Sequence, residues 1–210
     1  PQLTHYTSEK VAYLTFDDGP DNKNTPAVLD ILKANGIHAT FYVTGQMAQE
    51  NPAVLKRIFA EGHAIGNHSY DHNYKRLYKS KEDFLADMQQ SEEIIFNILG
   101  VRPLIIRAPG GTVGMFGNDF YEAINLAGYV PHDWNVSTED ATAKRPNASQ
   151  EVQFVDRMTK GRLKDDMALV LMHSCAGKEQ TVKALQGIIN TLKAKGYRFG
   201  VVTPITPQPW

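Results

Sequence analysis

Several features are scarce or missing in this sequence of 210 residues, and each absence excludes a class of protein. With a single cysteine, Cys175, the chain cannot form an internal disulfide bond. No apolar run approaches the roughly 20 residues that a membrane-spanning helix needs. Lysine and arginine occur at most as adjacent pairs and the net charge is −1, so no nucleic-acid-binding surface is predicted. We therefore expect no membrane span in this chain and no nucleic-acid partner.

What is present is an ordinary globular composition, with 42% hydrophobic and 21% charged residues. The length suits one large α/β domain, and no linker-like stretch divides the chain. We therefore expect residues 1–210 to form one domain. Because the chain begins with Pro1 rather than methionine, we also expect it to be a processed product.

Segments with strand composition alternate with segments of helical periodicity, most of which end at glycine. About seven strands in such alternation predict a parallel sheet, because each helix carries the chain back to start the next strand. The pattern fits either an incomplete α/β barrel or an open doubly wound sheet. The predicted strands are 11–16, 39–43, 64–66, 104–106, 129–131, 167–172 and 198–203, and the predicted helices are 25–35, 52–61, 80–99, 118–127, 149–163 and 179–195.

Unusual polar residues follow five of the predicted strands, at the end where parallel α/β proteins build their sites. Turn chemistry explains any one of these positions, but not all five at the same end. The five sets are Asp17 with Asp18, His68 with His72, Arg107, Asp133, and His173.

The segment HSYDH, residues 68–72, predicts part of a metal site. In an extended strand its two histidines would be about 13 Å apart. On one helical turn their Cβ atoms would be about 5–6 Å apart, close enough to share a cation. Two imidazoles with one carboxylate, and open positions for water, make a catalytic type of metal site. We therefore expect His68 and His72 to bind a divalent metal together with Asp17 or Asp18.

The adjacent carboxylates of Asp17 and Asp18 are then expected to divide the chemistry, one binding the metal and the other transferring a proton. Arg107 is a candidate partner for the second carboxylate. Pro109 and Gly110, in the segment RAPGG, predict a tight turn whose backbone N–H groups face a ligand.

Asp133 and His173 follow neighbouring predicted strands, so we expect the two side chains to pair. Such a pair orients the imidazole and raises its pKa, which makes a general acid that works near neutral pH. Trp134 and Leu171 are expected to supply an apolar wall.

Together, TFDDGP, HSYDH, RAPGG, DW and LMH resemble the polysaccharide deacetylase family, the NodB-like enzymes of carbohydrate esterase family four. The resemblance covers nearly the whole chain. It implies a distorted, incomplete (β/α) barrel and one divalent metal ion, zinc by preference, with cobalt or nickel as alternatives. It also implies a secreted or cell-surface location, a monomeric state and a polysaccharide substrate.

By position, the resemblance implies that Asp18, His68 and His72 bind the metal. It makes Asp17 the catalytic base, held by Arg107, and His173 the general acid, tuned by Asp133. Pro109, Gly110, Trp134 and Leu171 would contact the substrate. The implied reaction removes N-acetyl groups from N-acetylglucosamine residues, with peptidoglycan as the first choice of polymer and chitin, chitooligosaccharides or acetylxylan as alternatives.

Two departures and two rival functions accompany this interpretation. Gly110 stands where many relatives carry a bulkier residue, which predicts a wider groove, and Val130 stands where the family often has an aspartate. A non-haem iron oxygenase uses the same two histidines and one carboxylate, but it leaves Asp17 and His173 without a role. A non-catalytic carbohydrate-binding module on the same scaffold is the second rival.

Overall fold

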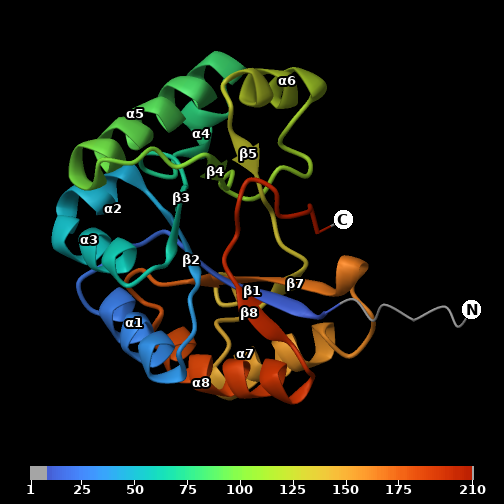
Figure 1. Cartoon of the computed structure of the whole chain (residues 1–210). Coiled ribbons are helices and arrows are strands. Elements are labelled where there is room, and N and C mark those ends of the chain that lie inside the picture. The colour runs from blue at the N-terminus through green and yellow to red at the C-terminus, as the bar shows by residue number, and fades with distance from the viewer. Residues whose placement is uncertain (1–8, 210) are drawn as a thin grey trace, which may run out of the picture.

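Eight parallel strands lie at the centre of the computed structural model, which describes residues 9–209 (Figure 1). The strands are β1 Val11–Asp17, β2 Thr40–Val43, β3 Ala64–Asn67, β4 Ile105–Ile106, β5 Val130–Pro131, β6 Val136–Ser137, β7 Met167–His173 and β8 Arg198–Gly200. The α-helices are α1 Asn24–Asn35, α2 Gly45–Glu50, α3 Pro52–Ala60, α4 Tyr74–Leu77, α5 Lys81–Leu99, α6 Asn118–Leu126, α7 Ala148–Met158 and α8 Glu179–Ala194.

The strand order β5-β4-β3-β2-β1-β7-β6 makes this sheet an incomplete barrel, as expected from the resemblance. Within residues 9–209, β5 and β6 pair with one neighbour each and not with one another, so the barrel stays open between them. The short β8 pairs with the first half of β1, while β2 pairs with its second half. The seven predicted strands are present, and β6 was not predicted.

The alternation of side chains along the strands decides which residues face the barrel interior. On β1, Leu14 and Phe16 belong to the large core beneath the outer helices, so Thr15 and Asp17 point inward. Strand β7 pairs with β1 along its whole length, with Asp17 opposite His173. On β7, Met172 packs outward, which leaves His173 on the inner side. The two strands thus present an acid and an imidazole together at their carboxyl ends.

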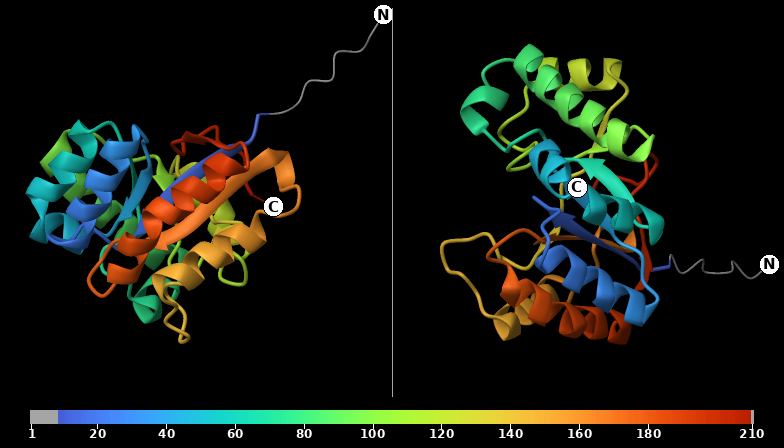
Figure 2. Two further views of the ribbon diagram at one scale, coloured as in Figure 1. Left: turned by 90° about the horizontal axis from the view of Figure 1, so that it is seen from below. Right: turned by 90° about the vertical axis from the view of Figure 1, so that its left-hand side faces the viewer.

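The helices cover the outside of the sheet in two groups (Figure 2). Helices α5 and α6 lie at one end, and α1, α7 and α8 lie at the other. The predicted helices are present, although α7 ends at Met158 rather than continuing to 163. The Thr159 hydroxyl donates to the Val155 carbonyl, and Gly161 follows two residues later, so both residues oppose further helix. Within residues 9–209, no helix is long and apolar enough to cross a membrane.

Candidate active site

A cavity of about 450 Å³ opens at the carboxyl ends of the strands. This is the rim at which the five sets of polar residues were predicted to meet. The predicted site residues that line the cavity are Asp17, Asp18, His68, His72, Gly110, Trp134, Leu171 and His173. Tyr74, Ser137, Glu139, Asp140, Ala141 and Thr142 line it as well, and none of these was predicted.

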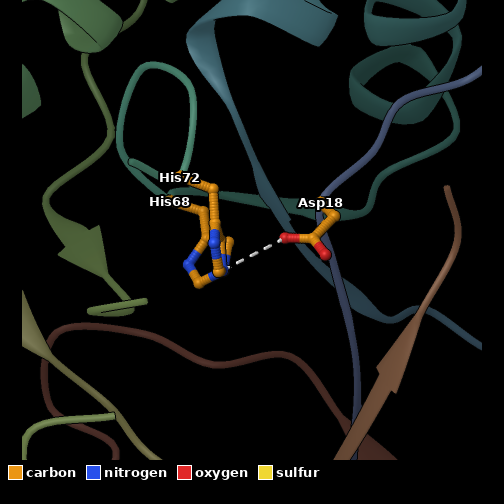
Figure 3. Close-up of side chains that lie close together, drawn as sticks. All are labelled: Asp18, His68 and His72. Atoms are coloured by element: carbon orange, nitrogen blue, oxygen red, sulfur yellow. Dashed lines mark ion pairs between the residues drawn. The ribbon is translucent and has the colours of Figure 1, made fainter. Parts of the chain in front are cut away.

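Asp18, His68 and His72 point toward one another in this cavity (Figure 3). Asp18 Oδ1 lies 3.4 Å from His68 Nε2 and 3.7 Å from His72 Nε2. Ligands about 2.0–2.2 Å from one tetrahedral zinc ion would be about 3.3–3.6 Å from each other. The spacing of the three side chains therefore suits one small divalent cation.

The hydrogen bonding of these residues fits a metal as well as their spacing does. Asp18 Oδ1 is buried and has no hydrogen-bond partner among the described residues, which is costly unless a cation binds it. His68 Nδ1 lies 2.7 Å from the Arg107 carbonyl oxygen. Because a carbonyl can only accept, Nδ1 carries the proton, so Nε2 is the ring nitrogen that faces the shared space and that would bind a metal once it is deprotonated.

Electrostatics keep the Asp18 carboxylate ionised. Burial would raise its pKa, but contact with His68 and the nearby His173 and His72 imidazoles outweigh burial and lower the pKa. An ionised carboxylate is the form that binds a metal.

The two histidines meet through a loop and not through the helical turn that their spacing suggested. Residues 68–73 lie between β3 and α4 in non-helical conformation. Ser69 and His72 both have positive φ values, 70° and 59°, which bend the chain back sharply. The Ser69 hydroxyl accepts a hydrogen bond from the His72 N–H at 3.0 Å and stabilises this bend. The predicted proximity is present, but its predicted local structure was wrong.

Asp17 is held by Arg107, as the sequence suggested. The fully buried guanidinium donates from Nη1 to Asp17 Oδ1 at 2.9 Å and to Thr15 Oγ1 at 2.6 Å. Its other donors reach the carbonyl oxygens of His132 and Asp133, both at 2.9 Å. With Oδ1 fixed in this way, the second oxygen of Asp17 lies 3.7 Å from His68 Nε2, beside the metal-binding group.

Asp133 does not pair with His173, which corrects that prediction. Both of its carboxylate oxygens accept from the Thr112 N–H, at 3.0 and 2.8 Å, and Oδ2 also accepts from the Thr112 hydroxyl at 2.7 Å. The carboxylate is therefore used to hold the turn that follows β4. Through its carbonyl oxygen, Asp133 also supports Arg107.

The partner of His173 is Asp140. Asp140 Oδ1 accepts from His173 Nδ1 at 2.8 Å, and Oδ2 accepts from the backbone N–H of the same residue at 2.8 Å. The opposite ring nitrogen, Nε2, lies 3.9 Å from Asp18 Oδ2 in the cavity. Burial would lower the pKa of His173, but the Asp140 carboxylate, together with the charges of Asp17 and Asp18, outweighs burial and raises it. His173 is thus equipped to present a proton to the cavity.

The turn RAPGG lies as expected beside the cavity, but the groove is not widened at Gly110. A Cβ atom at Gly110 would lie 2.8 Å from the Tyr74 hydroxyl oxygen, so the Tyr74 ring occupies that space. Gly110 has φ +77° and lines the cavity, and its N–H makes no hydrogen bond within the described part of the chain. Pro109 is buried outside the cavity, and its carbonyl oxygen accepts from the Tyr78 hydroxyl at 2.6 Å.

Asp140 and Tyr74 are the important residues that the sequence interpretation missed. Asp140 follows β6, a strand of two residues that is too short to show an alternating pattern. The adjacent acids Glu139 and Asp140 repeat the signal of Asp17 and Asp18, two neighbouring acids at or close to the carboxyl end of a strand. That signal would have identified Asp140 had β6 been recognised.

A family model described as polysaccharide deacetylase matches residues 4–132. The chain belongs to the polysaccharide deacetylase family. The resemblance seen in the motifs is thereby confirmed, and this polysaccharide deacetylase is a hydrolase.

Relatives of this polysaccharide deacetylase agree along nearly its whole length. A peptidoglycan-N-acetylglucosamine deacetylase of Bacillus cereus is 35% identical over 200 residues, which cover 95% of this chain and 71% of that protein. A carbohydrate esterase of family four from Streptococcus mutans has a TM-score of 0.87 at 31% identity, covering 93% of this chain and 87% of that one. The solved structure of a Bacillus cereus polysaccharide deacetylase has a TM-score of 0.86 at 33% identity, covering 96% and 97%.

Proposed function

We propose that this chain is a zinc-dependent deacetylase that hydrolyses the N-acetyl groups of N-acetylglucosamine residues in peptidoglycan. The observation that carries the proposal is one cavity in which a carboxylate held by arginine, an imidazole held by aspartate, and an Asp-His-His group meet. The relatives named above support a polysaccharide as substrate, and the Bacillus cereus relative supports peptidoglycan.

Asp18, His68 and His72 would hold the metal, and two imidazoles with one carboxylate are a donor set that zinc accepts. A bound zinc ion would polarise the acetamide carbonyl and acidify water in the cavity. The same donor set suits iron oxygenases. However, Asp17, which Arg107 holds, and His173, which Asp140 holds, have roles in hydrolysis and none in oxygen chemistry.

The two flanking side chains perform the proton transfers. Asp17, fixed through Oδ1 by Arg107, accepts the proton of the attacking water through its other oxygen. The free Gly110 N–H is available to stabilise the oxyanion that forms on the carbonyl oxygen. His173 then donates its Nε2 proton to the departing amine, and acetate and a free amine are the products.

Trp134 and Leu171 complete the proposal on the substrate side. Both line the cavity, and Leu171 is 8% exposed at the inner face of β7. They provide an apolar surface for the acetyl methyl group, and the Tyr74 ring adds an aromatic surface beside Gly110 on which a sugar can pack. We further propose that residues 1–210 act as one catalytic domain, as a monomer, outside the cytoplasm where peptidoglycan lies.

Acetate release tests the proposal. The protein is stripped of metal and assayed on peptidoglycan, on N-acetylglucosamine oligomers and on acetylated xylan, before and after addition of zinc, cobalt or nickel. We expect zinc-dependent release, preferentially from peptidoglycan, and its loss in Asp17→Asn. Preference for the oligomers would favour a chitin-type deacetylase, and preference for xylan would favour an acetylxylan deacetylase. One equivalent of bound zinc without release from any polymer would favour a binding module and contradict the proposed activity.

A further inference from the structure

The hydrogen bonds that support His173 continue beyond Asp140 into the protein. Thr181 Oγ1, at the start of α8, lies 3.0 Å from Asp140 Oδ2 and 3.3 Å from Glu151 Oε1 on α7. Thr181 is fully buried and Glu151 is 1% exposed. Glu151 also lines a second cavity of about 520 Å³ that shares Asp140 with the active site. No step of the reaction described above uses Glu151 or Thr181.

The number of available protons fixes the direction of the hydrogen bonds between Asp140, Thr181 and Glu151. The Thr181 hydroxyl has one proton and lies between two carboxyl groups, so it can donate to only one of them. Asp140 is the ionised partner, because its two oxygens already accept from the backbone N–H and Nδ1 of His173. If Thr181 donates to Asp140, Glu151 Oε1 faces a lone pair of the hydroxyl. That contact is a hydrogen bond when Glu151 carries a proton and donates it.

The surroundings of Glu151 agree with a neutral carboxylic acid. Its Oε2 is buried and has no hydrogen-bond partner within residues 9–209, which costs far less for a neutral acid than for an anion. Burial and the nearby Asp140 raise the pKa of Glu151 to about 8, and Thr181, Lys178 and His173 oppose that rise without cancelling it. Arg145 and Lys178 line the same cavity, but neither is within ion-pair distance of Glu151 among the described residues.

We propose that Glu151 is a positioning residue for the proton donor: as a neutral acid it donates to Thr181, which directs the Thr181 proton to Asp140 and so fixes the orientation of His173. This role rests on the proposed function of His173 as general acid. When Glu151 ionises, two carboxylates compete for one hydroxyl proton. Asp140 then shares the Thr181 hydroxyl with Glu151, His173 is less firmly oriented, and kcat falls.

Kinetics of three variants and one matched control test this role. Glu151→Gln keeps a donor at this position, so kcat should stay within about twofold at pH 7. The alkaline limb set by His173 should remain in this variant, but the additional fall in kcat expected in the parent enzyme when Glu151 ionises near pH 8 should be missing. Glu151→Ala and Thr181→Val should each lower kcat about fivefold with little change in KM. Thr191→Val is the control, because Thr191 lies on the same helix and its hydroxyl donates only to the Gly187 carbonyl.

Carboxyl and imidazole NMR tests the role without any substrate, so it is independent of the proposed function. In protein labelled at glutamate Cδ, one resonance should titrate above pH 7 and be missing from Glu151→Gln. The Nδ1 proton of His173 should give a low-field signal that exchanges faster in Thr181→Val than in Thr191→Val. Titration of every glutamate below pH 6 would overturn the proposal, even if Glu151→Ala fails to fold. Unchanged kcat, pH profile and His173 signal in Thr181→Val would overturn it too.

Discussion

His173 pairs with Asp140 and not with Asp133, and this difference yields the sharpest prediction. In Asp140→Asn the amide has no negative charge to stabilise the imidazolium, and it places a neutral group against Nδ1. The lost bond is 2.8 Å long, both side chains are buried, and hydrogen bonds to charged groups contribute about 1.5–3 kcal/mol. At about 1.36 kcal/mol for each factor of ten, kcat should fall about 10- to 150-fold.

The pH dependence separates this effect from general damage to the site. Because Asp140 raises the pKa of His173, its loss must lower that pKa, and the alkaline limb of kcat should move to lower pH. Asp133→Asn is the matched control: it weakens the bonds to Thr112, so it should lower stability by about 1–3 kcal/mol without moving that limb. Direct titration of the His173 ring by NMR provides the second measurement. If Asp133→Asn moves the limb and Asp140→Asn does not, the reasoning is refuted.

Three further perturbations follow from the same geometry. Arg107→Met leaves the buried Asp17 carboxylate without its cation, so urea unfolding should show a loss of about 3–5 kcal/mol, and a loss below 1 kcal/mol would contradict the buried ion pair. Gly110→Ala should lower kcat/KM because its Cβ meets the Tyr74 hydroxyl, and Tyr74→Phe in the same chain should restore part of that loss; strictly additive effects would exclude the contact. Between its unfolded pKa of about 4.5 and its folded pKa of about 8, Glu151 holds a proton only in the folded protein. The free energy of unfolding should therefore fall with rising pH by up to about 1.4 kcal/mol per pH unit over that window, relative to Glu151→Gln. Parallel curves of stability against pH for the two proteins would show that Glu151 ionises normally.

Long periodic segments made most of the fold predictable from the sequence. The buried run of β7 and the glycine-terminated helices have patterns that depend on many residues, so tertiary context does not override them. The order of the strands in the sheet and the open edge between β5 and β6 depend on long-range pairing, which no local pattern encodes. Strand β6 has two residues, and α4 has four, so neither is long enough to show a period.

The site was predictable where chemistry is carried by short motifs and unpredictable where it depends on loop conformation. Asp17, Asp18 and His173 follow strands whose ends the sequence marks clearly. Which of Asp133 and Asp140 pairs with His173 depends on the path of residues 132–140 between β5 and α7. The sequence alone allows either acid to be that partner. Tyr74, the first residue of α4, reaches Gly110 in the turn after β4, and such a contact has no signature in either segment.

The contacts of the Arg107 side chain have a consequence for the folding of the site. It projects from the end of β4, yet its guanidinium contacts β1 through Thr15 and Asp17, three strands away in the sheet order, and the carbonyls beyond β5. One side chain therefore ties opposite walls of an open barrel where backbone pairing cannot. Until both walls have assembled, Asp17 lacks the contact that aims it. If Asp17 acts as proposed, a partly folded chain that holds every motif is expected to be inactive until Arg107 reaches Asp17.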